Sequence, residues 1–235
     1  MELLLTSPWT KTMLLSIENE VDPDARYLGE ALRELLPACA VHDAVRDGGR
    51  PPQETLPADG FDALSGVVVG GSTAGVYEAD DHPWMREEAE FVRECVDHGV
   101  PVLGVCFGHQ LVNEALGGRV EHHGLDHRLV SADLADDPLL DGVDSTIPAV
   151  HGDRVVESGD GMEPLASTAD YEFFATRHRD APVWTTQFHP EFTHDLLATI
   201  RADFGWTDDG DLSWDDVTAH RVLPNFARLA TSGNE

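Results

Sequence analysis

The stretch PVLGVCFGHQ, residues 101–110, combines a short apolar run, a cysteine between two glycines and the start of a helical pattern. The run at 101–105 predicts a buried strand, and residues 107–118 predict a helix that ends at a pair of glycines. The G-x-C-x-G turn around Cys106 is the thiol form of a nucleophile elbow. A helix that begins at the sulfur favours a thiolate through its positive N-terminal end. A buried structural cysteine is the alternative, so other residues must decide between the two.

The segments before this turn repeat the alternation of strand and helix. Apolar runs predict the strands, and one-sided apolar patterns with Pro or Gly at their ends predict the helices. The predicted strands are residues 2–6, 38–45, 66–71 and 101–105, and the predicted helices are residues 24–36, 83–99 and 107–118. Fully apolar strands that alternate with helices indicate an α/β fold, with a mostly parallel sheet covered by helices on both faces.

The pattern changes beyond Arg119, where short strands follow one another between Asp, Gly and Pro residues. These strands predict a small antiparallel extension of the sheet, and residues 216–230 predict a final helix that Pro224 kinks. The short strands are RLVSADL (128–134), TIPAV (146–150), DRVVE (153–157), YEFFATR (171–177) and PVWTTQF (182–188). Residues 46–60 read as a Gly- and Pro-rich loop. Without a repeat or a low-complexity linker, we predict one domain over residues 1–235.

The charge of the chain is strongly negative. Its 44 acidic and 15 basic residues give a formal net charge of -29, and Lys11 is the sole lysine. Such a chain repels phosphate backbones and anionic lipid, which argues against nucleic-acid and membrane partners. The composition resembles that of proteins from salt-loving archaea, where molar salt shortens the Debye length to about 3 Å and screens the repulsion. An ordinary acidic protein is the alternative.

The cysteines and the N-terminus bear on the compartment. Three widely spaced cysteines indicate a reducing environment rather than a disulfide framework. MELLLTSPWTKT, at the N-terminus, has no basic region before its apolar run and does not resemble a signal peptide, and no stretch has the roughly 20 apolar residues of a membrane helix. We therefore expect a cytoplasmic protein.

A second chemical motif is QFHPEF, residues 187–192, at the end of the last short strand. His189 and Glu191 are two residues apart, so an extended backbone places both side chains on one side. A histidine can serve a thiol nucleophile as base and then as acid, and a carboxylate on its second nitrogen fixes the tautomer. An exposed histidine and a solvated glutamate would be the simpler reading of this motif in isolation.

A third motif is Gly70-Gly71-Ser72, which ends the strand predicted at 66–71. Acyl transfer needs hydrogen-bond donors for a tetrahedral oxyanion. The backbone N–H of Phe107, directly after the cysteine, is one natural donor, and the N–H of Gly71 at a neighbouring strand end could be the second. A plain strand-ending turn is the alternative.

Together, GVCFGHQ and QFHPE resemble the class I (triad) glutamine amidotransferases, and the resemblance runs from about Ala58 to Phe192. It implies a flavodoxin-like α/β fold and hydrolysis of the glutamine side-chain amide through a γ-glutamyl thioester, with no cofactor and no metal. The resemblance also assigns roles: Cys106 as nucleophile, His189 as base, Glu191 as its orienting carboxylate, Gly71 and Phe107 as oxyanion donors, and Gly70, Gln110 and His151 as glutamine-binding positions. Thr73 stands where many relatives have proline.

The combination of GVCFGHQ, ALGG, HGD and QFHPEF resembles the stand-alone GMP synthase-like branch of that family. A complete GMP synthase needs a phosphate-binding loop, and a G-x-x-x-x-G-K-[ST] motif is excluded because the sole lysine, Lys11, follows Thr10. The resemblance therefore implies ammonia transfer to a synthetase partner on another chain. A γ-glutamyl peptidase or hydrolase with the same triad, and a catalytically silent binding module, are the alternatives.

The segment EHHGLDH, residues 121–127, gathers three histidines and an aspartate that could hold a metal. A polar surface turn is the preferred reading in a chain with 12 histidines. Cys39 and Cys95 fall on a predicted strand and a predicted helix face, where structural cysteines are common. No metal site is predicted.

Overall fold

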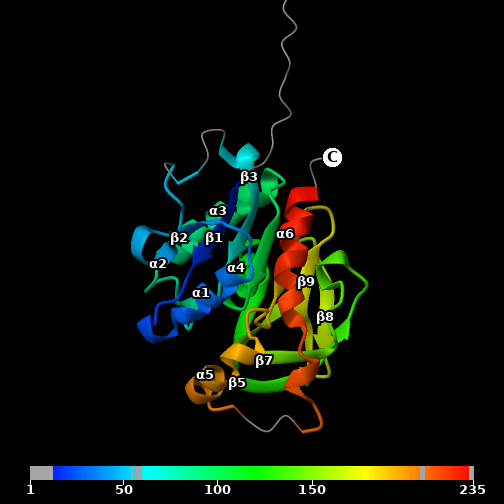
Figure 1. Cartoon of the computed structure of the whole chain (residues 1–235). Helices are drawn as coiled ribbons and strands as arrows, with labels where there is room; N and C mark the ends of the chain where they lie inside the picture. The colour runs from blue at the N-terminus through cyan, green and yellow to red at the C-terminus, as the bar shows by residue number, and fades with distance from the viewer. Residues whose placement is uncertain (1–12, 54, 57–59, 207–209, 233–235) are drawn as a thin grey trace, which may run out of the picture.

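A central sheet of eight strands organises the computed structural model, which describes residues 13–53, 55–56, 60–206 and 210–232 (Figure 1). The strand order is β2-β1-β3-β4-β10-β9-β8-β6, and a separate two-stranded sheet pairs β5 with β7. The strands are β1 Met13–Glu18, β2 Ala40–Asp43, β3 Leu64–Val69, β4 Val102–Val105, β5 Arg119–Ser131, β6 Asp133–Leu134, β7 Thr146–Glu157, β8 Met162–Thr168, β9 Tyr171–His178 and β10 Val183–Thr186.

The sheet has a parallel half and an antiparallel half. Neighbouring strands from β2 to β10 run parallel, whereas β10, β9, β8 and β6 pair antiparallel. The prediction of a mostly parallel sheet with an antiparallel extension is confirmed, and so is the flavodoxin-like fold class. The α-helices are α1 Tyr27–Glu34, α2 Ala44–Asp47, α3 Trp84–Asp97, α4 Phe107–Ala115, α5 Leu197–Phe204 and α6 Val222–Ser232.

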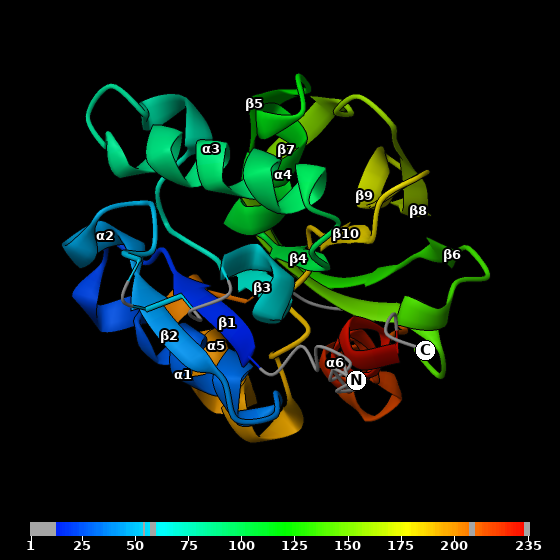
Figure 2. The same ribbon diagram turned by 90° about the horizontal axis from the view of Figure 1, so that it is seen from above.

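Helices cover both faces of the parallel strands, which explains why the central strands β3 and β4 are buried at every position. In β3, Val68 packs in a core with α1 and α6, whereas Val67 and Val69 point into the other core with α3 and α4. Figure 2 shows α3 and α4 on one side of the sheet and α1 and α6 on the other. Among the described residues, no helix is long and apolar enough to cross a bilayer.

Several elements differ from the sequence-based expectation. The strand expected at 2–6 lies outside the described residues, and the first described strand is β1. The helix expected at 24–36 is divided into a 3₁₀ turn, Pro23–Ala25, and α1. The expected loop at 46–60 begins inside α2, a one-turn helix that Asp43 caps by accepting from the Arg46 N–H.

The C-terminal half differs more. The two short strands expected at 146–150 and 153–157 are one continuous strand, β7, and β8 was not predicted. The final helix begins only at Val222, after a 3₁₀ turn. Pro224 therefore lies in the first turn of α6, where its missing N–H breaks no hydrogen bond, and the expected kink is not needed.

The functional motifs gather at one edge of the sheet. Gly70 follows β3, Cys106 follows β4 and Gln187 follows β10, and these three strands are parallel neighbours. The carboxyl ends of adjacent parallel strands meet at the same edge, which is where open α/β sheets bind ligands. The topology thus brings together segments separated by about 80 residues of sequence.

Candidate active site

Cys106 occupies a strained backbone position between β4 and α4. Its φ of 52° and ψ of -103° make it the one described non-glycine residue with a positive φ. Such a conformation costs on the order of 1–3 kcal/mol and persists only where the surroundings enforce it. The Cys106 N–H donates to the Thr186 carbonyl at 2.8 Å and so ties the turn to the end of β10. The sulfur is thereby presented at the N-terminus of α4.

The two glycines of the turn permit close contacts that no other residue allows. A Cβ on Gly104 would lie 2.4 Å from the Gly108 carbonyl oxygen, and a Cβ on Gly108 would lie 2.2 Å from the Val69 carbonyl oxygen. Both obstacles are backbone atoms that cannot rotate away. The G-x-C-x-G spacing is therefore a steric requirement of packing α4 against β3 and β4.

His189 and Glu191 follow β10 and form a buried pair. Glu191 Oε1 lies 2.7 Å from His189 Nδ1, and the two residues are 4% and 2% exposed. The His189 ring stacks on Phe192, with centroids 4.3 Å apart and planes at 12°. With Nδ1–H donating to Glu191, the other ring nitrogen is left for Cys106, whose side chain forms a hydrogen bond with His189.

Charge around His189 stabilises its protonated form. Burial by itself would lower the pKa of His189, but the negative charges of Cys106 and Glu191, and hydrogen bonds to both side chains, raise it well above its ordinary value. In this arrangement the histidine can exchange a proton with the Cys106 side chain, and the carboxylate can fix the orientation of the ring.

The segment 70–73, here called the glycine loop, closes the site on the β3 side. The Gly70 carbonyl accepts from Gly108 N–H at 3.1 Å and from Asn19 Nδ2 at 3.3 Å, and the Gly70 N–H donates to the Ile17 carbonyl at 3.0 Å. A Cβ on Gly71 would lie 3.4 Å from His189 Cε1 and 3.8 Å from Cys106 Cβ. The loop is therefore locked in place while Gly71 faces the histidine and the cysteine.

Thr73 holds the other end of the glycine loop. Its hydroxyl donates to Glu20 Oε1 at 2.5 Å, and its backbone N–H points at the same oxygen at 3.3 Å. Glu20 follows β1 and is itself 7% exposed. This side-chain bond anchors the loop at Thr73.

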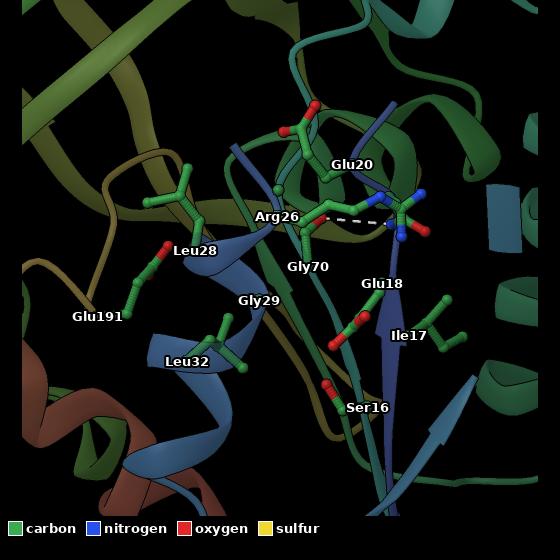
Figure 3. A pocket seen from close by; sticks show the side chains of 12 residues that line it. Ser16, Ile17, Glu18, Glu20, Arg26, Leu28, Gly29, Leu32, Gly70 and Glu191 are labelled. Atoms are coloured by element: carbon green, nitrogen blue, oxygen red, sulfur yellow. Dashed lines mark hydrogen bonds between the residues drawn. The ribbon is translucent and has the colours of Figure 1, made fainter. Parts of the chain in front are cut away.

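Behind the glycine loop lies a small pocket of about 20 Å³ between β1 and α1 (Figure 3). Gly70 and Glu191 line this pocket, together with Leu28 and Leu32 of α1. Figure 3 shows Gly70 on this side, where its carbonyl accepts the hydrogen bond from Asn19 Nδ2. Gly70 does not line the larger cavity in front of Cys106, which is described next. Its backbone hydrogen bonds support the glycine loop instead.

A cavity of about 280 Å³ opens in front of Cys106. Gly71, Gln110, His151 and His189 all line it, so the structure brings these predicted site residues together. Burial lowers the pKa of His151 to about 4, so this side chain is neutral at pH 7.

Gln110 is oriented by two acceptors inside the protein. Its Nε2 donates to the Gln187 side-chain oxygen at 3.2 Å and to the Asp153 carbonyl at 3.4 Å. Phe107 is 1% exposed, and its N–H lies in the first turn of α4, directly after the sulfur. Its ring packs in the core against Trp84, so its contribution to the site is the backbone.

The mouth of this cavity carries residues that the motifs did not indicate. Tyr77 and Leu125 expose 55% and 57% of their surface beside it. Asp153 accepts from Tyr77 Oη at 3.2 Å and contacts His122 Nδ1 at 2.8 Å. No local pattern could have revealed this rim, because it joins a 3₁₀ turn after β3 to the β5–β7 pair.

The histidine-rich segment 121–127 forms part of β5. Within the described residues there is no group of three or more His, Cys, Asp or Glu side chains placed to hold a metal. Asp126 pairs with Arg128 and Arg154, and His127 Nδ1 contacts the Phe204 carbonyl. The side chains of this segment thus serve contacts across the surface.

Comparisons with known proteins identify the family of the chain. The family described as "Glutamine amidotransferase class-I" matches residues 51–204. A protein named "GMP synthase [glutamine-hydrolyzing]" from Thermobifida fusca is 30% identical over 178 residues, which cover 74% of this chain and 31% of that protein. One of the same name from Wolinella succinogenes is 32% identical over 152 residues, 61% of this chain and 28% of that protein. The chain therefore spans about 30% of the length of these relatives.

Solved structures share the fold at low sequence identity. A glutamine amidotransferase from Thermotoga maritima is 18% identical with a TM-score of 0.67, and the match covers 95% of this chain and 94% of that one. A glutamine amido transferase from Methylobacillus flagellatus is 18% identical with a TM-score of 0.68, covering 95% of both chains. At this identity the likeness concerns the fold.

Proposed function

The chain belongs to the class I glutamine amidotransferase family, and from that premise we propose that it hydrolyses the side-chain amide of glutamine to glutamate and ammonia. The observation that carries the proposal is the convergence of Cys106, His189 and Gly71 on one cavity, with Glu191 bonded to the far nitrogen of His189. The strained cysteine backbone supports it, because a structural cysteine needs no such conformation.

The reaction begins with attack of the Cys106 thiolate on the side-chain carbonyl carbon of glutamine. As the C–S bond forms, the carbonyl π electrons move to oxygen, and the N–H groups of Gly71 and Phe107 donate to the oxyanion. The His189 imidazolium gives its proton to the amide nitrogen. The C–N bond then breaks, ammonia leaves, and a γ-glutamyl thioester with neutral His189 remains.

Water completes the cycle. Neutral His189 accepts a proton from the water that attacks the thioester carbonyl, and Glu191 stabilises the imidazolium that forms. Collapse of the second tetrahedral intermediate breaks the C–S bond and releases glutamate. The thiolate and the imidazolium are restored, so no cofactor and no metal enters the cycle.

In this proposal, the ammonia made at this site is transferred to the acceptor substrate of a synthetase on a separate chain. The name of the relatives, "GMP synthase [glutamine-hydrolyzing]", supports this proposal, because it couples glutamine hydrolysis to a synthase reaction. Tyr77 and Leu125 are exposed beside the mouth, where such a partner would approach. The glutamine-binding roles of Gln110 and His151, which line the cavity, belong to the same proposal, whereas Gly70 supports the loop that carries Gly71.

The net charge of -29 supports work in a salt-rich cytoplasm. Neither nucleic acid nor a membrane is a partner in this proposal, because a surface of this charge repels both phosphate backbones and anionic lipid.

Replacing the nucleophile tests the activity. Cys106→Ala should lower glutamine hydrolysis by at least about a thousandfold, because the covalent route is lost. The measurement is glutamate release from glutamine, with a γ-glutamyl peptide as a parallel substrate. Cys39→Ala, which changes a cysteine away from the cavity, is the matched control and should keep wild-type activity.

Either of two results would contradict the proposal. Hydrolysis by Cys106→Ala within tenfold of wild type would remove the nucleophile role, since covalent catalysis contributes far more than about tenfold. Faster glutamate release from the γ-glutamyl peptide than from glutamine would make the chain a γ-glutamyl hydrolase. No turnover of either substrate by the wild type would favour a binding module.

A further inference from the structure

Gln187 contacts the sulfur of Cys106, although the reaction described above gives it no role. The residue follows β10, is fully buried, and places its side-chain Nε2 at 3.7 Å from Cys106 Sγ. It opens the QFHPEF motif, so the segment that supplies His189 and Glu191 supplies this amide as well. An amide N–H next to a sulfur that becomes a thiolate is a charge-assisted donor.

The orientation of the Gln187 amide is fixed by its oxygen. Oε1 accepts from Gln110 Nε2 at 3.2 Å and from Tyr171 Oη at 3.2 Å. Gln110 must present Nε2 there, because the same NH₂ group also faces the Asp153 carbonyl. A flipped Gln187 amide would place NH₂ against NH₂, so the N–H groups of Gln187 are left to face the sulfur.

Tyr171 is fixed in the same way. Its hydroxyl accepts from the Val155 backbone N–H at 2.9 Å and gives its one proton to Gln187. His109 Nε2, 3.1 Å from the same hydroxyl, must therefore donate to it. Burial lowers the pKa of His109 to about 3, so the ring is neutral and carries its single proton on Nε2.

The series of hydrogen bonds continues from His109 into the core, and all its donors point in one direction. His109 Nδ1 accepts from Thr185 Oγ1 at 2.7 Å, which obliges Thr176 Oγ1, 2.6 Å away, to donate to Thr185. Asn113 Nδ2 donates to Thr176 Oγ1 at 3.2 Å. Every donor from Asn113 onward thus points toward Gln187 and, through it, toward Cys106.

We propose that Gln187 is a catalytic residue whose side-chain N–H stabilises the Cys106 thiolate, and that Tyr171 and His109 are positioning residues that hold this amide in orientation. The inference rests on Cys106 as nucleophile in the proposed function. A buried hydrogen bond to a charged acceptor is stronger than one to a neutral acceptor, so the contact favours thiolate over thiol. The bond weakens when the sulfur becomes a neutral thioester, and it re-forms when glutamate leaves.

The pH dependence of Cys106 alkylation measures this contact directly. In Gln187→Met, which keeps the side-chain length and removes the N–H, the midpoint of the rate against pH should rise by about one unit, the shift expected when a hydrogen bond to a charged group is lost. Gln187→Glu should raise it further, because a carboxylate repels the thiolate. The readout is peptide mapping of Cys106 after brief iodoacetamide treatment. An unchanged midpoint in both variants would overturn the proposal.

Asn225→Asp is the matched control. Asn225 also donates two side-chain hydrogen bonds, to the Leu139 and Asp141 carbonyls, at a place away from the cavity. Its replacement should lower the melting temperature and leave the alkylation midpoint of Cys106 where it is. A midpoint that moves equally in this control would show that general loss of stability, not the amide, sets thiol reactivity, and would overturn the proposal.

Tyr171→Phe keeps the test decisive should the Gln187 variants not fold. It removes the donor that fixes the amide oxygen while leaving Gln187 itself, so the midpoint should rise less than in Gln187→Met. No rise in folded Tyr171→Phe would contradict the positioning role. Alkylation does not require glutamine turnover, so failure of the proposed glutaminase activity and failure of this inference give different results.

Discussion

At the scale of single residues, the site combines groups that the sequence motifs identify with groups that only the fold brings in. The G-x-C-x-G turn and the His-x-Glu pair suggest a nucleophile and a base from residue type and spacing, and the resemblance to the amidotransferase family assigns these roles to Cys106, His189 and Glu191. Gln187, Tyr171 and His109 could not be assigned to the site from the sequence in this way. Their hydrogen bonds exist because β9 pairs with β10 and α4 packs beneath them, and no local pattern encodes that register.

Glu88 allows a prediction about pH and stability. It is fully buried in α3, and burial raises its pKa to about 8, an effect that the nearby Asn19 side chain only partly opposes. The folded protein keeps this proton up to about pH 8, whereas the unfolded chain releases it near pH 4.5. The stabilising contribution is therefore complete below pH 4.5 and is lost as the pH rises through about 8.

Glu88→Gln should remove this dependence. From pH 5 to pH 9 its melting temperature should fall less than that of the wild type, by an amount that corresponds to a few kcal/mol. Thermal melts of both proteins in the same molar KCl measure the difference. Parallel curves over this range would show that Glu88 does not hold its proton in the folded state.

At the scale of elements, the parallel half was predictable and the antiparallel half less so. Apolar runs buried on both faces mark β3 and β4 clearly, and Gly or Pro marks the ends of α3 and α4. β5 gives little signal because most of its N-terminal residues are exposed. The steric fit of the turn between β4 and α4, by contrast, follows from the two glycines of the G-x-C-x-G motif.

Gly108→Ala should disrupt the joint between α4 and β3. The new Cβ would meet the Val69 carbonyl oxygen, and the shift needed would disturb the bond from Gly108 N–H to Gly70 that anchors the glycine loop. We expect a loss of at least about 1–3 kcal/mol in unfolding free energy, together with a fall in glutamine hydrolysis. Urea denaturation and the glutamate assay measure the two effects.

Gly29→Ala in α1 is the control for that substitution. Its Cβ would contact only the end of the Glu18 side chain, at 3.2 Å, and alanine favours a helix by roughly 1 kcal/mol. It should therefore lose far less stability than Gly108→Ala and keep activity. Equal losses in the two variants would contradict the steric account of the turn.

At the scale of the whole molecule, the main feature is the large excess of negative charge. Composition alone gives the net charge of -29, and the described ion pairs, such as Arg50 with Glu94 and Arg177 with Asp137, neutralise few of the acids. The remaining acids repel one another at low ionic strength, where the Debye length reaches about 30 Å. The melting temperature should therefore rise from dilute buffer to molar KCl. An equal or lower melting temperature in molar KCl would refute adaptation to salt.

The central claim is that Cys106 is the nucleophile that glutamine reaches, and covalent labelling tests it most directly. An electrophilic glutamine analogue, added to the folded wild-type protein in molar KCl, should modify one site, and peptide mapping should place it on Cys106. Burial raises the pKa of both Cys95 and Cys39, which disfavours their thiolates, and neither lines the cavity. Free glutamine should slow the labelling of Cys106. Label on Cys39 or Cys95 in folded protein, or labelling of Cys106 that glutamine does not slow, would contradict the account.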